Sequence, residues 1–288
     1  MRLAVGTVQF GLDYGIANKQ GRVPLEEAKA VLDYAASCGM DTLDTAIAYG
    51  DSEQRLGELG VHDWNVVSKL PSIPDDCDDV GAWARSAVMG SLGRLRTNRL
   101  YGLLLHRPLE LLGPRGMALY DALELLKDDG LVQKTGVSAY DPSELAELSE
   151  SFQFDLVQAP LSLMDRRLVD SGWLQRLAEL GTELHVRSIF LQGLLLMSPV
   201  DRPKSFDRWP DLWGEYDDWL ITTGLTRLQA CVRYPLSFPE VSKVVIGVDN
   251  AGQLRDIVSA SRGSVPQIRN EFRTDEPELL NPARWALN

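Results

Sequence analysis

The feature that most constrains the fold is a regular alternation of short apolar runs and longer amphipathic stretches along the chain. The short runs are rich in residues that favour β-strands. They span Leu3–Val8, Met40–Asp44, Asn65–Lys69, Leu100–His106, Val132–Ser138, Leu156–Pro160, Thr182–Ser188 and Lys243–Gly247. Stretches with a helical apolar period lie between them, at Leu25–Ser37, Val80–Leu95, Met117–Lys127, Ser143–Ser149 and Leu168–Leu180. Because strands joined through helices pair in parallel, the alternation predicts an α/β fold with a parallel sheet.

Eight consecutive strand–helix units close most naturally into a (β/α)8 TIM barrel, which is a single domain. A doubly wound open sheet is the alternative. The glycine-rich fingerprint of that fold is missing after the first run, because the segment Gly6–Gly11 lacks the first pair of glycines. We therefore predict an eight-stranded parallel barrel over residues 1–273 and a C-terminal tail, residues 274–288, that packs on it.

Composition excludes several classes of function. The chain has 29 Lys and Arg against 41 Asp and Glu, a net charge of −12, which disfavours nucleic acid as a partner. The apolar run Ile189–Met197 is too short to span a membrane. The widely spaced Cys38, Cys77 and Cys231 favour a reducing, cytoplasmic location, and the scattered histidines argue against a metal site. The sequence is compatible with a monomer.

Titratable residues follow three consecutive predicted strands. Asp44 ends the second strand and is followed by Tyr49, Lys69 ends the third, and His106 ends the fourth. In a (β/α)8 barrel the carboxyl ends of the strands surround the active site. Each residue alone has an ordinary structural explanation, such as a turn cap or a hydrogen-bonded core group. Their joint placement predicts a catalytic group of four side chains.

The stretches around these residues resemble the aldo-keto reductase family. They are Leu43–Glu53, which is close to the family string D-T-A-x-x-Y-G-x-S-E, together with Val67–Lys69 and Leu103–Pro108. Further matches are Gly6–Gly11, Gly136–Ser138, Gln158, Ser188, Gly193–Leu195, Gly247 and Gln253–Leu254. The resemblance implies a barrel that carries an Asp, Tyr, Lys and His tetrad.

The tetrad has a physical rationale. Reduction of a carbonyl leaves an alkoxide that needs a proton, and a tyrosine with an ordinary pKa donates it poorly at neutral pH unless its phenolate is stabilised. We expect Tyr49 to be the general acid/base and Lys69 to supply positive charge beside it. Asp44 would hold Lys69 by a charge-assisted pair, and His106 would hydrogen-bond the substrate oxygen.

The resemblance also implies an NADP or NAD cofactor, since no side chain donates a hydride. We expect Ser138 and Gln158 to bind the carboxamide, and the backbone near Ser188 to bind the pyrophosphate. The adenosine end would meet the helix that begins at Ala251. The full set of expected cofactor contacts is Gly6, Thr7, Ser138, Gln158, Arg187, Ser188, Leu191, Gly193, Gly247, Asp249 and Gln253.

Three residues depart from the family pattern. Ala139 stands where an asparagine is frequent, and Arg187 replaces the tyrosine that stacks under the nicotinamide. Asp249 stands where a cation would hold the 2′-phosphate of NADPH, the usual cofactor of the family, and this shifts the expectation slightly towards NAD. A planar guanidinium can still stack, but its charge disfavours a cationic ring.

The resulting hypothesis is an NAD(P)-dependent oxidoreductase that acts on an aldehyde, ketone or sugar. The alternatives are a non-redox acid/base enzyme that eliminates or epimerises a sugar, and a nucleotide-binding sensor with the same fold. Gln9, Tyr14, Trp209 and Trp213 are candidates to line the substrate pocket. The two tryptophans belong to the longest interval between strands, and packing on the outside of the barrel explains them equally well.

Overall fold

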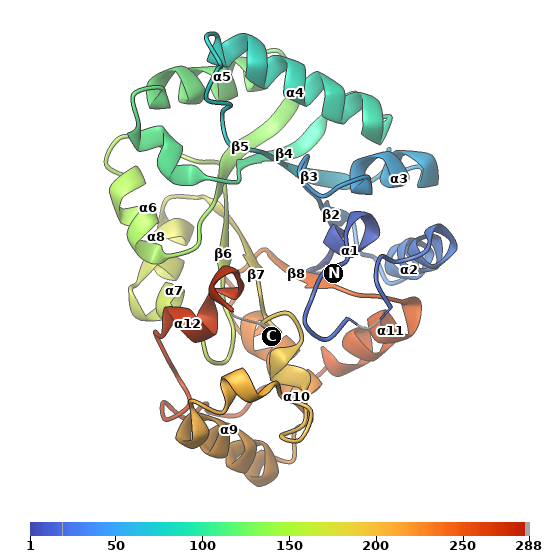
Figure 1. The fold of residues 1–288 in the computed structure, drawn as a ribbon, viewed down its shortest axis with the longest axis vertical. Coiled ribbons are helices and arrows are strands. Elements are labelled where there is room, and N and C mark those ends of the chain that lie inside the picture. Colours follow the sequence, from blue (N-terminus) through green and yellow to red (C-terminus); the bar gives the residue numbers. More distant parts are fainter. Residues whose placement is uncertain (19, 286–288) are drawn as a thin grey trace.

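The computed structural model describes residues 1–18 and 20–285. Parallel strands β1 to β8 pair in chain order, and β8 pairs with β1 to close a barrel (Figure 1). Their bounds are Leu3–Gly6, Thr42–Asp44, Asn65–Leu70, Leu100–Leu105, Val132–Ser138, Leu156–Pro160, Glu183–Arg187 and Lys243–Gly247 for β1 to β8. The predicted (β/α)8 barrel is therefore confirmed, and the open sheet is excluded.

Helices surround the strands on the outside of the barrel (Figure 1). They are α1 (Val8–Gly11), α2 (Leu25–Ser37), α3 (Ser52–Leu59), α4 (Val80–Leu95), α5 (Gly116–Asp128), α6 (Pro142–Leu148), α7 (Arg167–Asp170), α8 (Trp173–Glu179), α9 (Pro210–Thr223), α10 (Arg227–Leu236), α11 (Ala251–Ala260) and α12 (Pro277–Leu280). Short 3₁₀ turns span Pro108–Leu112, Leu194–Leu196, Lys204–Phe206 and Pro282–Arg284. Helices α9 and α10 occupy the long interval between β7 and β8.

Two boundaries differ from the sequence prediction. The run Leu3–Val8 is a strand only as far as Gly6, and Val8 already belongs to α1. The predicted helix Leu168–Leu180 is divided into α7 and α8, because Gly172 between them has a φ of 78° and interrupts the helical backbone. Helix α3, which follows Tyr49 closely, was not predicted.

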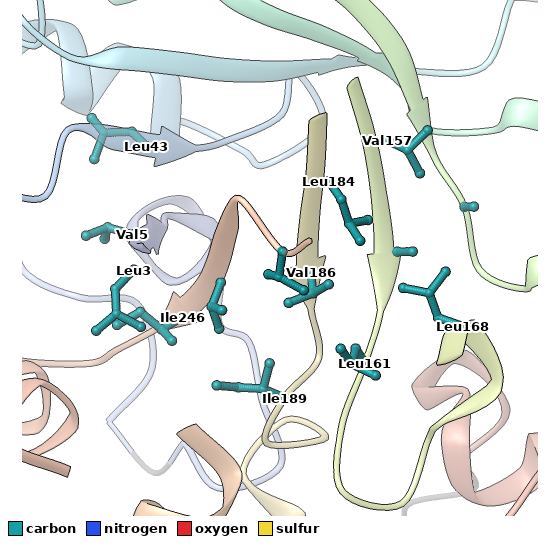
Figure 2. Packing of buried hydrophobic residues seen from close by; sticks show 14 of the residues in the cluster. Leu3, Val5, Leu43, Val157, Leu161, Leu168, Leu184, Val186, Ile189 and Ile246 are labelled. Carbon is teal, nitrogen blue, oxygen red and sulfur yellow. The ribbon is translucent and has the colours of Figure 1, made fainter. Parts of the chain in front are cut away.

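The main hydrophobic core lies between the strands and the helices. In α2 the residues on one helical face are buried, namely Ala28, Val31, Leu32 and Ala35. Figure 2 shows strand side chains of the same core, including Val5 of β1, Leu184 of β7 and Ile246 of β8. The apolar period that predicted the helices is thus the period of their contact with the barrel.

A second, smaller cluster consists of Val67, Leu104 and Leu156, from β3, β4 and β6. Residues two apart on a strand point to the same face of the sheet. Lys69 therefore points to the same face of β3 as Val67, and Gln158 points to the same face of β6 as Leu156. Lys69 lies two residues nearer the carboxyl end of β3 than Val67, and Gln158 lies two residues nearer the carboxyl end of β6 than Leu156. The inward side of the barrel therefore changes from apolar to polar towards the strand ends.

A polar network joins the amino-terminal parts of β4, β5 and β7. Glu183 accepts hydrogen bonds from the Tyr101 hydroxyl at 2.6 Å and from Lys134, and its Oε1 lies 2.7 Å from Nε2 of the buried His185. Burial opposes ionisation of Glu183, but these partners lower its pKa to about 2. His185 is thereby held in a structural network.

The described part of the C-terminal tail contacts the barrel. The Thr274 amide donates to the Met164 carbonyl at 3.1 Å, and Leu279 is buried. Arg269 and Asn270 precede the tail. Arg166 donates to the Arg269 carbonyl at 2.7 Å and to Oδ1 of Asn270 at 3.2 Å. These bonds hold the end of the chain against the loop that follows β6. Residues 286–288 of the predicted tail lie outside the described residues.

Candidate active site

A buried ion pair occupies the carboxyl ends of β2 and β3. Lys69 Nζ lies 2.7 Å from Asp44 Oδ1 and donates a second hydrogen bond to the Thr45 carbonyl at 2.8 Å. The Lys69 side chain is only 1 % exposed. Burial lowers the pKa of Lys69, and the carboxylate of Asp44 opposes that shift. The pair expected from the sequence is thus formed, and water is excluded from it.

The second carboxylate oxygen of Asp44 is bound by a residue of β6. Gln158 Nε2 donates to Asp44 Oδ2 at 2.6 Å, and Ser138 Oγ lies 3.3 Å from Gln158 Oε1. All three side chains are buried. Of the two expected carboxamide-binding residues, Gln158 is therefore linked directly to the Asp44–Lys69 pair and Ser138 is linked to it through Gln158, a connection that the sequence did not predict.

Tyr49 lies beside the ion pair, on the loop between β2 and α3. Its ring centroid is 5.2 Å from Lys69 Nζ and 6.0 Å from the His106 ring, which meets it edge to face. Burial raises the pKa of Tyr49, the negative charge of Asp44 adds to this shift, and the positive charge of Arg187 opposes it. The hydroxyl of Tyr49 is therefore protonated at neutral pH.

His106 follows the last residue of β4, and its backbone amide donates to the Leu70 carbonyl at 3.1 Å, which fixes the chain there to β3. Burial lowers the pKa of His106 to about 4, and the positive charges of Lys69 and Arg187 add to this effect. The imidazole is accordingly neutral at physiological pH. The barrel brings all four members of the expected tetrad together.

Arg187, the last residue of β7, lies among the same side chains. Its Nη2 donates to the Ala139 carbonyl at 3.0 Å, and its Nη1 donates to Ser188 Oγ at 3.2 Å. The guanidinium carbon lies 4.5 Å from the centroid of the Tyr140 ring. Tyr140 was not identified from the sequence, although its position two residues beyond Ser138 on the end of β5 was an available signal.

The loop after β7 has a compact backbone with several residues in the left-handed region. Ser188, Leu191, Gln192 and Gly193 have φ angles of 62°, 45°, 53° and 93°. A Cβ atom on Gly193 would lie 2.5 Å from Ala17 Cβ, so glycine permits the close approach of the loop that follows β1. The Gln192 amide donates to the Tyr14 hydroxyl at 3.2 Å across the same contact. The loops after β1 and β7 therefore meet.

The ends of β1 and β8 also meet, through Gln9. A Cβ atom on Gly247 would lie 2.4 Å from Gln9 Nε2, so a larger residue at this position would displace the Gln9 amide. Gln9 is buried, and its Oε1 has no hydrogen-bond partner in the described residues. Thr7, beside it, donates from Oγ1 to the Asp44 carbonyl at 3.0 Å. Gly6 is the last residue of β1 and pairs with Gly247.

The amino terminus of α11 is occupied by side chains of this protein. Asn250 Oδ1 accepts from the Gln253 amide at 2.9 Å, and the Glu27 carboxylate accepts from the Ala251 amide at 2.7 Å. The Asp249 amide donates to Gln253 Oε1 at 2.8 Å. Glu27 comes from α2 and had no sequence signal, because 224 residues separate it from Ala251.

Trp209 and Trp213 form a group with other aromatic residues around α9. Trp213 is buried, its Nε1 donates to the Phe206 carbonyl at 2.9 Å, and Arg202 stacks on its ring at 4.2 Å. The Trp209 ring lies 6.4 Å from that of Phe206. These contacts agree with packing on the outside of the barrel, which was the alternative to a position in the substrate pocket.

The described residues contain neither a metal-binding cluster nor a membrane-spanning helix. Within residues 1–18 and 20–285, no three His, Cys, Asp or Glu side chains are grouped so as to hold a metal ion. None of the helices in this part of the chain is both long enough and apolar enough to cross a membrane.

Comparison with known proteins agrees with this geometry. The profile of the Aldo/keto reductase family matches residues 2–268. An uncharacterized oxidoreductase of Bacillus subtilis, YqkF, is 25% identical over an alignment 262 positions long that covers 82% of each chain. Among solved structures, the putative aldo-keto reductase PA4992 of Pseudomonas aeruginosa has a TM-score of 0.66 at 24% identity, with 90% of this chain and 89% of that chain covered.

The holo form of the aldo-keto reductase AKR11C1 of Bacillus halodurans has a TM-score of 0.71 at 22% identity, with 99% of this chain and 94% of that chain covered. At these identities the two structures show a shared fold. The family profile spans nearly the whole barrel, including every member of the tetrad. This chain therefore belongs to the aldo/keto reductase family and is an oxidoreductase.

Proposed function

We propose that this protein interconverts a small-molecule carbonyl compound and its alcohol with a nicotinamide cofactor, and that Tyr49 is the general acid/base. The observation that carries the proposal is the buried Asp44–Lys69 pair, 2.7 Å long, beside Tyr49 and His106 at the carboxyl ends of the strands. Such a group suits proton transfer to an oxygen that becomes negatively charged.

The environment of Tyr49 suits the role of proton donor. Burial keeps its hydroxyl protonated at neutral pH, so the proton is available when an alkoxide forms. Transfer of that proton leaves a phenolate, which the nearby positive charges of Lys69 and Arg187 stabilise. In the direction of alcohol oxidation the phenolate takes the proton back.

The remaining members of the tetrad position the reacting groups and polarise the carbonyl. Asp44 holds the Lys69 ammonium in place, and the hydrogen bond from Gln158 holds Asp44. His106 is neutral because its pKa is about 4, so it supplies a hydrogen bond to a carbonyl oxygen without a positive charge. The charge that assists the reaction therefore resides on Lys69 and Arg187.

The residues around the strand ends fit a nicotinamide dinucleotide. Gln9 Oε1 is a buried acceptor without a partner in the described residues, which a hydroxyl of the cofactor would satisfy. Ser138 and Gln158 offer the hydroxyl and amide that suit a carboxamide, and the loop from Ser188 to Gly193 offers backbone amides for the pyrophosphate. When bound, the cofactor supplies the hydride.

We further propose that the cofactor is NAD. The 2′-phosphate of NADP needs a cation or a free helix amino terminus. At α11 the Ala251 amide is already bound by the Glu27 carboxylate, and Asp249 adds a second negative charge nearby. Arg255, a residue that would oppose them, instead stacks on Tyr34 of α2 at 5.3 Å.

Replacement of Tyr49 tests the reaction. Tyr49→Phe removes only the hydroxyl, and we expect kcat to fall by about 10²–10⁴-fold, the usual contribution of a general acid. Turnover is followed as absorbance at the nicotinamide band, which also separates a redox reaction from a non-redox one. Affinity for the reduced cofactor, measured by fluorescence titration, should stay nearly unchanged.

Tyr120→Phe is a matched control, because the Tyr120 hydroxyl bonds the Gln153 carbonyl on the outside of the barrel. This variant should retain full activity. Full activity of Tyr49→Phe would refute the assignment.

A binding comparison tests the cofactor choice. We expect the wild-type protein to bind NADH about tenfold more tightly than NADPH, a difference of roughly 1.4 kcal/mol. Asp249→Asn and Glu27→Gln each remove a negative charge while keeping a hydrogen-bonding group, so each should narrow the ratio by improving NADPH binding. Tighter binding of NADPH by the wild-type protein would contradict this choice.

A further inference from the structure

Arg187 is a half-buried cation at the site that makes no ion pair among the described residues. Its hydrogen-bond partners are the Ala139 carbonyl and the Ser188 hydroxyl, both uncharged, and the guanidinium stacks on the ring of Tyr140. An arginine has five N–H donors, and these bonds use two of them. The Nε–H group and one N–H of each terminal nitrogen are not used by these bonds.

The neighbours of Arg187 leave its charge uncompensated. Lys69 is paired with Asp44, so together they carry no net charge. His106 is neutral at physiological pH, and the guanidinium is close enough to it, and to Tyr14 and Tyr49, to shift their pKa values. Arg187 is therefore a positive charge without an ion-pair partner among the described residues, in a protein whose formal net charge is −12.

A half-buried guanidinium fork of this kind is suited to a planar anion, since it binds a carboxylate through two parallel hydrogen bonds. We propose that Arg187 binds a carboxylate of the substrate, so that this enzyme acts on aldehydes or ketones that also carry a carboxylate. The proposal rests on the proposed function, because the carbonyl of the same substrate is expected between Tyr49 and His106. The acid group would then lie on the β7 side of the site.

The cofactor is the competing source of an anion, because its pyrophosphate is also negatively charged. The two sources predict different effects of the same substitution. Loss of a substrate contact impairs substrates that carry the anion more than those that lack it, whereas loss of a pyrophosphate contact weakens cofactor binding and impairs every substrate equally. A matched pair of substrates therefore separates them.

The experiment compares 4-carboxybenzaldehyde with its methyl ester, which has the same aldehyde without the charge. We expect the wild-type protein to favour the acid in kcat/KM. Arg187→Gln keeps a donor for the Ala139 carbonyl and removes the charge. Loss of the positive charge beside Tyr49 lowers kcat/KM for both substrates, and loss of the carboxylate contact should lower kcat/KM for the acid by about a further 10- to 100-fold relative to the ester. Arg187→Lys keeps the charge but not the planar guanidinium. Its kcat/KM for the acid should lie between those of the wild-type protein and Arg187→Gln.

Arg107→Gln is the matched control. Arg107 is an exposed arginine next to His106, so its removal changes the local field without removing the proposed contact. An equal loss for Arg107→Gln and Arg187→Gln would overturn the proposal in favour of a general effect of charge. Circular dichroism of each variant checks that the barrel is intact.

Binding gives a second readout that does not need turnover. Calorimetric titration of 4-carboxybenzaldehyde into the wild-type protein and into Arg187→Gln should show weaker binding to the variant, by about tenfold or more. If neither aldehyde is reduced, this titration still decides the role of Arg187, independently of the test of the proposed function by Tyr49→Phe. Equal binding of the acid to both proteins, or a weakened affinity for NADH in Arg187→Gln, would overturn the proposal.

Discussion

Replacement of Asp44 by asparagine tests the buried charge pair most directly. The substitution keeps the size of the side chain but removes the negative charge that faces Lys69 Nζ at 2.7 Å. Because the Lys69 side chain is 1 % exposed, water cannot take over the role of the carboxylate. Removal of one partner of a buried ion pair typically lowers the free energy of unfolding by about 3–5 kcal/mol.

The lysine sets an upper limit on this loss, because it can release its proton. The ordinary pKa of lysine is 10.5, and one pKa unit corresponds to about 1.4 kcal/mol. Holding Lys69 neutral at pH 7 therefore costs at most about 4.8 kcal/mol. In Asp44→Asn the unfolded chain then binds a proton that the folded chain lacks, so the stability of the variant rises with pH. The difference from wild type narrows as long as the wild-type protein keeps Lys69 protonated.

Urea unfolding of both proteins at pH 7, 8 and 9 measures the effect. We expect a difference of about 3–5 kcal/mol at pH 7 that shrinks by about 1.4 kcal/mol per pH unit. The double substitution Asp44→Leu with Lys69→Met removes both charges and should recover most of the stability. A difference below about 1 kcal/mol at pH 7, or one that does not change with pH, would show that the pair is not buried as described.

Two further predictions concern pH. Glu183→Gln should lower the free energy of unfolding by about 3 kcal/mol at neutral pH, because the folded-state pKa of Glu183 is about 2 against an ordinary 4.5. This stabilisation is complete above pH 4.5 and is lost as the pH falls towards 2, so melts of both proteins should converge there; a constant gap would contradict it. His106, followed by NMR, should titrate near pH 4, and a midpoint near 6.5 would mean that the imidazole is solvated.

The sequence predicted most of the fold because the decisive signals are local. Strand-forming runs and helical apolar periods depend on neighbours a few residues away, and the runs from Asn65 to Lys69 and from Leu156 to Pro160 match the observed strands to within a residue. Helix α3 was missed because it is short and its signal overlaps the motif around Tyr49. The division of α7 from α8 depends on the left-handed φ of Gly172. The spacing of apolar residues does not indicate this backbone conformation.

The candidate site could be predicted where each residue ends its own strand. Asp44, Lys69 and His106 needed only a strand assignment and the rule that strand ends meet in a barrel. The partners of these residues could not be predicted in this way. Gln158 reaches Asp44 from 114 residues away. Its amide has no preference for that carboxylate until the barrel places β6 opposite β2.

By itself, then, the sequence determined the order of strands and helices, the barrel and the positions of the tetrad, because these follow from patterns along the chain. Only the tertiary structure decided which polar groups have hydrogen-bond partners and which charges lack an opposite charge. It placed Glu27 on the amino terminus of α11, and it left Arg187 without a carboxylate among the described residues. The physical reason is that burial and the pairing of charges depend on distances across the barrel, which residue spacing does not encode.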